Sequence, residues 1–142
     1  LAAMSMLMTY PGVPSIFMGD ELGFEGLSGE DARRTINWED RSNWDQPFLA
    51  EVKKLTKIRR TEDAFINGGL RWVAAEDNYL AYLRESKKSK VLVVIVAKPC
   101  TVDIDLSKLG YKVSKTLFGQ KATGTRIKYK TNTANQGIWK LS

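Results

Sequence analysis

The residues best suited to chemistry lie close together, in the polar stretch that follows the first apolar run. Asp20 and Glu21 are adjacent carboxylates, and Asp31, Arg33 and Arg34 follow shortly after them. Carboxylates can act as general acids and bases, and arginine can bind vicinal hydroxyls or a carboxylate with its forked donors. Neighbours on an extended strand point to opposite faces, so we interpret Asp20 and Glu21 as structural residues that hydrogen-bond the following loop.

Other chemistries are excluded within this chain because it lacks the residues that perform them. The sequence contains no histidine, so it supplies no imidazole base, no His-paired nucleophile and no His metal ligand. Its single cysteine, Cys100, cannot form an internal disulfide, which favours a reducing compartment, the cytoplasm. We expect neither a metal nor a cofactor in this chain.

Charge is distributed unevenly along the chain. Residues 1–83 carry 9 basic and 13 acidic side chains, whereas residues 84–142 carry 13 and 3, so net charges of −4 and +10 add up to +6. A basic half can bind a polyanion. The lysines are scattered through strand-like segments, however, so we favour a solvated surface and expect no nucleic-acid partner.

No membrane segment is expected. The apolar run from Leu1 to Met8 ends at Tyr10, Pro11 and Gly12, far short of the roughly 20 residues that span a bilayer. The chain opens inside an apolar helical pattern without an initiating methionine, as a piece of a longer protein would.

The elements predicted for residues 1–67 place the polar residues in a loop between two helices. The helix, the strand, a long loop with one short helical turn and the second helix are expected at Leu1–Thr9, Val13–Met18, Gly19–Asp45 and Pro47–Arg60. Helix, strand, loop and helix in this order are typical of the closing portion of a β/α barrel.

The apolar period changes to that of strands in residues 68–142. Seven strands are predicted, at 70–75, 79–84, 91–97, 101–106, 113–118, 125–129 and 137–141. Turn residues separate them at short intervals, which favours an antiparallel β-sandwich as a second domain. Residues 91–96 are apolar on both faces and should form a central, covered strand.

Residues 12–23 resemble the eighth barrel strand of glycoside hydrolase family 13, the alpha-amylase superfamily. The positions that match that family's pattern are Gly12, Pro14, Ile16, Phe17, Gly19, Asp20, Glu21 and Gly23. Asp31, Arg33, Arg34 and Trp38 continue the pattern, but its first Asp and its Pro are missing here. The stretch Arg71–Arg84 is most similar to the neopullulanase and cyclomaltodextrinase group.

The resemblance implies a fold and a function. The fold is the last β/α unit of a (β/α)8 TIM barrel followed by the C-terminal sandwich of the family. The parent protein would be a retaining alpha-glycosidase that hydrolyses alpha-glucosidic bonds in malto-oligosaccharides or related alpha-glucans. Its Asp nucleophile, Glu acid/base and second Asp would precede Leu1, so this chain would hold no catalytic residue and would be inactive alone.

Site roles follow from the same resemblance. Arg33, Asp31 and Trp38 are candidate substrate-binding residues, and Gly19, Asp20, Glu21 and Arg34 are candidate structural residues of the barrel rim. For Arg33, sugar contact and a loop-fixing salt bridge are equally open. For Trp38, packing of the loop on the last helix is favoured over sugar stacking. Barrel faces that lack their neighbours would also favour self-association.

Two other classes of function stay open. Residues 70–142 could be a non-catalytic carbohydrate-binding β-sandwich, although Tyr79, Tyr82 and Trp139 are better explained as sandwich core or as cross-strand pairs. The basic half could instead bind a polyanion, with strong salt dependence.

Overall fold

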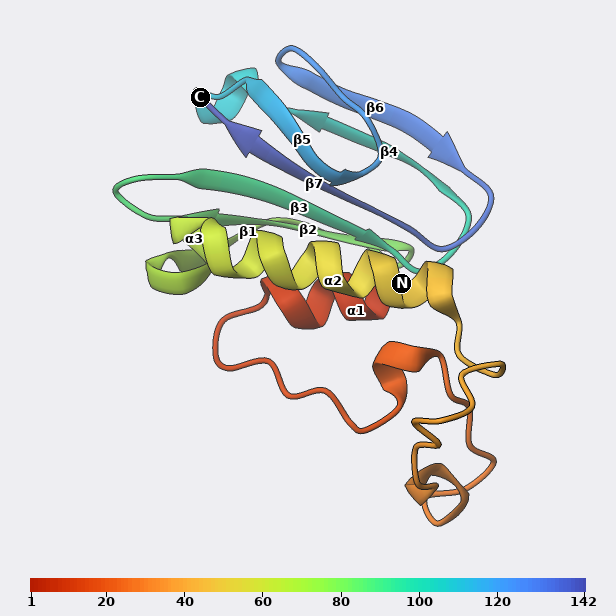
Figure 1. Ribbon diagram of the computed structural model, residues 1–142. Helices are drawn as coiled ribbons and strands as arrows, with labels where there is room; N and C mark the ends of the chain where they lie inside the picture. Colours follow the sequence, from red (N-terminus) through yellow and green to blue (C-terminus); the bar gives the residue numbers. More distant parts are fainter.

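The chain forms three layers: helices, a five-stranded sheet and a two-stranded sheet (Figure 1). The computed structural model describes residues 1–142, except for the side chain of Ala32. Its helical elements are α1 (Ala2–Thr9), α2 (Gln46–Thr61) and α3 (Asp63–Asn67), with 3₁₀ turns η1 (Asp20–Leu22), η2 (Asp31–Arg33) and η3 (Ser107–Leu109). Its strands are β1 (Gly69–Ala75), β2 (Tyr79–Glu85), β3 (Lys90–Val96), β4 (Cys100–Asp105), β5 (Val113–Gly119), β6 (Arg126–Thr131) and β7 (Asn135–Leu141).

The predicted antiparallel sandwich is confirmed, strand by strand. One sheet has the order β1-β2-β3-β7-β5, the other pairs β4 with β6, and every pairing is antiparallel. Figure 1 shows β4 and β6 on one side of the larger sheet and all three α-helices on the other. The larger sheet is therefore covered on both faces.

Strand β3 lies at the centre of the larger sheet, as its sequence predicts. Val91, Val93 and Ile95 belong to the core on the helical side, and Leu92 and Val94 belong to the core between the sheets. Because side chains alternate along a strand, a strand with apolar residues at every position needs cover on both faces.

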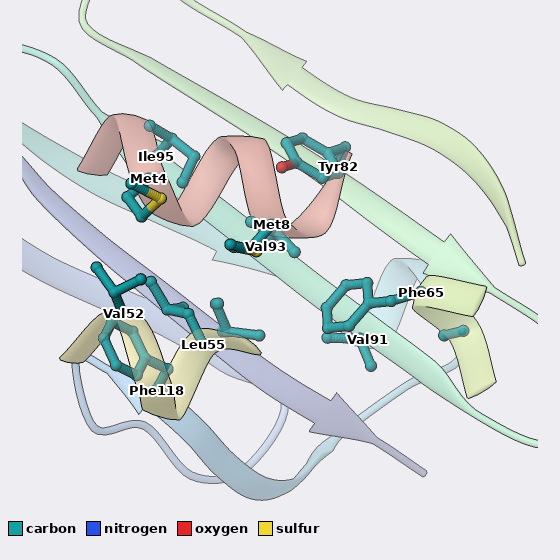
Figure 2. Packing of buried hydrophobic residues seen from close by; sticks show 12 residues of the cluster. Met4, Met8, Val52, Leu55, Phe65, Tyr82, Val91, Val93, Ile95 and Phe118 are labelled. Atoms are coloured by element: carbon teal, nitrogen blue, oxygen red, sulfur yellow. The ribbon is translucent and has the colours of Figure 1, made fainter. Parts of the chain in front are cut away.

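The helical layer packs on the sheet through a few large apolar side chains (Figure 2). Met4 and Met8 of α1 and Val52 and Leu55 of α2 are buried in this core, together with Phe65 of α3. Their three- and four-residue spacings place each set on one face of its helix. The core thus extends across the domain boundary proposed at residue 67.

The predicted strand at 13–18 is not formed. Residues 13–17 are extended but pair with no other strand, and Val13 is 95% exposed and Phe17 51% exposed. An isolated strand leaves its backbone N–H and C=O groups without partners, so it depends on neighbouring strands for its ladder. The structure therefore confirms the sandwich but contains no barrel strand.

Two of the predicted sandwich-core aromatics lie in different layers. Trp139 is fully buried between the two sheets, whereas Tyr82 is fully buried in the core against the helices. The Tyr82 hydroxyl lies 2.6 Å from the Thr9 hydroxyl of α1.

No helix among the described residues has the length and apolar character needed to cross a bilayer.

Candidate functional site

The two ends of the polar loop from Gly19 to Asp45 lie close together. The side chain of Leu22 in η1 is buried, and the Asp45 amide donates to the Leu22 carbonyl over 2.9 Å. Gly19 has φ +99°, and a Cβ there would lie 2.8 Å from the Phe24 ring. The tight start of the loop therefore requires glycine.

Asp20 and Glu21 lie in this first 3₁₀ turn and not on a strand. Glu21 accepts a hydrogen bond from the Gly19 amide at its Oε2 atom, over 3.1 Å. Asp20 is exposed, and its carbonyl accepts a hydrogen bond from the Gly23 amide. Glu21 thus binds the backbone of its own turn, which is the kind of contact expected of a structural rim residue.

Asp31 and Arg34 form the strongest polar contact of the loop. The Arg34 guanidinium donates to both Asp31 oxygens, from Nη2 at 2.6 and 2.7 Å and from Nε at 3.1 Å. The Leu27 amide also donates to Asp31, over 2.9 Å. The Arg34 guanidinium, followed by the Leu27 amide, lowers the pKa of Asp31, so this pair stays ionised at neutral pH.

Because Asp31 pairs with Arg34, the Arg33 guanidinium has no carboxylate partner among the described residues. Its side chain is exposed, and among the described residues it makes no side-chain hydrogen bond or ion pair. Asp31 therefore pairs with the second arginine of the motif and not with the first.

Trp38 and Trp44 contact each other at the far end of the loop. Their rings meet edge to face with centroids 5.5 Å apart, and the Arg41 guanidinium lies 5.1 Å from the Trp44 ring centroid. Trp38 remains 63% exposed. Arg41 was not among the residues predicted from the sequence, although its spacing of three residues from both tryptophans was a usable signal.

Trp38 lines a largely apolar hollow of about 520 Å³ that also borders α2. On the loop side it is lined by Ile16, Met18, Glu21 and Ile36, and on the other side by Leu49, Val52, Lys53 and Thr56 of α2. The packing of Trp38 on the last helix, which the sequence favoured, is thus only partial. The exposed indole could contact a ligand that enters the hollow.

The described residues offer no metal centre. No group of three or more Cys, Asp or Glu side chains among them is arranged to hold a metal ion. The roles assigned to Arg33, Asp31 and Trp38 remain predictions.

No family model matches this chain. Among curated proteins, it is 33% identical over 89 residues to a cyclomaltodextrinase from a Bacillus species, an alignment covering 61% of this chain and 16% of that protein. It is 32% identical over 90 residues to neopullulanase 2 from Thermoactinomyces vulgaris, with 62% and 15% covered. The chain thus spans less than a fifth of the length of these relatives.

The fold has close counterparts among solved structures. A crystal structure of an Anoxybacillus alpha-amylase superposes on 99% of this chain with a TM-score of 0.80, at 20% identity, and 31% of the alpha-amylase chain is covered. At 20% identity, the structural similarity to the alpha-amylase shows the fold alone. The similarity in sequence comes from the matches to the curated proteins. In sequence and in fold, this chain is therefore a relative of the family 13 glycoside hydrolases, the alpha-amylase family, similar to their cyclomaltodextrinase and neopullulanase group.

Proposed function

We propose that this chain is part of a retaining alpha-glycosidase that hydrolyses alpha-glucosidic bonds in malto-oligosaccharides or related alpha-glucans. The sequence matches to a cyclomaltodextrinase and a neopullulanase carry this proposal. The catalytic carboxylates would lie outside this chain. Two geometric facts support that placement: Glu21 binds the backbone of its own turn, and Asp31 is held by Arg34.

The loop would supply substrate contacts at the edge of the active site. Arg33 offers an exposed guanidinium, and Trp38 offers an exposed flat ring above an apolar hollow. Guanidinium donors suit vicinal sugar hydroxyls, and aromatic faces suit the apolar faces of sugar rings. Asp31 would act indirectly, because its bidentate pair with Arg34 fixes the loop beside Arg33.

The first test compares this chain with the complete enzyme on maltotriose and on cyclodextrin. We expect turnover only in the complete enzyme. Turnover by the isolated chain would overturn the proposal and would make Asp20, Glu21 and Asp31 the next residues to replace.

The second test addresses the loop in the complete enzyme. Arg33→Ala should raise the Michaelis constant for maltotriose about tenfold and change kcat less, because a lost charge-assisted hydrogen bond is worth about 1.5–3 kcal/mol. Lys57→Ala is the control, since Lys57 is an exposed cation of α2 that does not line the hollow beside Trp38. Equal Michaelis constants in the two variants would remove Arg33 from the substrate site.

For the carbohydrate-binding alternative, the sandwich offers one half-exposed aromatic, Trp72 of β1, which is 48% exposed. Tyr82 and Trp139 are fully buried and present no ring face to solvent. Starch affinity of the isolated chain, measured by sedimentation with insoluble starch, would revive that alternative.

A further inference from the structure

A cavity of about 560 Å³ lies away from the candidate site, between the segment that follows α1 and the junction of α2, α3 and β2. Arg59 and Arg60 of α2 and Arg84 of β2 line it, and Val13 and Phe65 supply apolar walls. No carboxylate is among its lining residues in the described part of the chain. Three arginines thus line one cavity.

The hydrogen bonds of Arg59 and Arg84 all go to backbone carbonyls, and the Arg84 guanidinium also lies 5.8 Å from the centroid of the Phe65 ring. Arg59 donates to Met8 over 3.2 Å, to Tyr10 over 2.7 Å and to Gly12. Arg84 donates to Gly68 over 2.8 Å, to Gly69 over 3.2 Å, and to Thr9 and Phe65. A guanidinium has five N–H donors, so the Nε–H of Arg59 and one N–H on its Nη2 remain available.

Most of these carbonyls, though not those of Gly12 and Gly69, belong to helix ends, which explains part of the arrangement. Met8 and Thr9 are the last residues of α1, and Phe65 and Gly68 lie at the end of α3. A helix C-terminus carries roughly −0.5 of an elementary charge, so two such ends supply about −1 at most. Three guanidinium groups carry +3, which leaves the cavity with an excess of positive charge.

Nearby carboxylates do not supply the missing negative charge. Glu62 pairs with Lys140 over 3.0 Å, and neither Glu62 nor Asp63 lines the cavity. Arg84 is only 2% exposed. Burial, followed by the nearby charge of Arg59, lowers the pKa of Arg84, as expected for a cation without a counter-charge.

We propose that this cavity binds a small oxyanion, a phosphate or a carboxylate. Arg59 and Arg60 donate to it from α2, and Arg84 supplies positive charge from the floor of the cavity. Forked donors match the oxygen geometry of both anions. The apolar walls at Val13 and Phe65 leave room for a carbon portion of the ligand. This site is independent of the proposed glycosidase activity.

The test is thermal unfolding of this chain with increasing inorganic phosphate or acetate, at constant ionic strength balanced with chloride. A ligand that binds only the folded state raises the unfolding temperature with its concentration. We expect saturable stabilisation by at least one of the two oxyanions. Stabilisation by phosphate alone identifies a phosphate site, and stabilisation by acetate alone identifies a carboxylate site. If neither exceeds chloride, the proposal is overturned.

Two matched variants locate the site. Arg60→Gln should weaken the affinity for the active anion about tenfold, because one charge-assisted hydrogen bond is lost. Lys57→Gln removes the same charge from an exposed position of α2 outside the cavity and should leave the affinity within about twofold. Equal weakening in both variants would show only nonspecific charge attraction and would also overturn the proposal.

Discussion

Gly137 shows at the scale of one residue how tightly the two sheets are packed. It lies beneath the ring of Trp139, two positions further along β7, and that ring is fully buried. A Cβ on Gly137 would lie 2.0 Å from the Cη2 atom of Trp139 and 2.3 Å from its Cζ2 atom. Glycine is therefore required here for side-chain space.

We expect Gly137→Ala to lower the free energy of unfolding by about 1–3 kcal/mol, the usual cost of overpacking a core. The measurement is urea unfolding followed by tryptophan fluorescence. Gly69→Ala is the matched control, since a Cβ there would meet no atom within 4 Å and Gly69 also lies in a strand. Equal midpoints for the two variants would contradict this explanation.

Single residues also mark the limit of what the sequence could predict. The burial of Tyr82 follows from its place in an apolar strand. The sequence does not tell which of the two cores Tyr82 joins, because both faces of β2 are covered. The cavity around Arg59 and Arg84 had no local signal at all. Their partners at Met8, Thr9 and Gly68 are brought together only by the packing of three helices on the sheet.

At the scale of elements, prediction succeeded where each element carries its own pattern. The strand patterns of β1 to β7, including the run in β3 that is apolar on both faces, were sufficient, as was the three- and four-residue spacing of α2. The helix found at Gln46–Thr61 differs by one residue at each end from the prediction. The segment 13–18 also carries an apolar pattern, but a strand needs a neighbour, and none pairs with it here. Sequence pattern thus predicts the capacity for a strand and not its pairing.

The start of α2 links the candidate loop to the helical layer. Asp45 is the N-cap of this helix, and its Oδ1 atom accepts a hydrogen bond from the Phe48 amide over 2.9 Å. We expect Asp45→Ala to lower the free energy of unfolding by about 1 kcal/mol, because it leaves a helix N–H without a partner. Asp45→Asn should retain most of the stability.

Urea unfolding followed by circular dichroism measures this contribution. Glu39→Ala is a suitable control, because it removes an exposed carboxylate from the same loop and should change stability by less than about 0.5 kcal/mol. If Asp45→Ala and Glu39→Ala have the same midpoint, the cap contributes nothing measurable.

At the scale of the whole molecule, the loop side differs from the sandwich. The side chains of Val13 and Leu27 are almost fully exposed, and those of Phe17 and Met18 are about half exposed. Figure 1 shows the segment 10–45 extending away from the helical layer, with no second layer beyond it. Apolar side chains exposed in one continuous stretch of chain favour association, because their burial removes apolar surface from water.

We therefore expect this chain to self-associate through residues 13–27. Light scattering coupled to size exclusion should show the mass rising above that of a monomer as concentration increases. The double variant Val13→Ser with Phe17→Ser should shift the distribution to the monomer, because it replaces two exposed apolar side chains with small polar ones. Leu1→Ser replaces an exposed apolar residue outside this segment and should leave the mass unchanged. A wild-type chain that stays monomeric at every concentration would show that these exposed residues form no interface between copies of the chain.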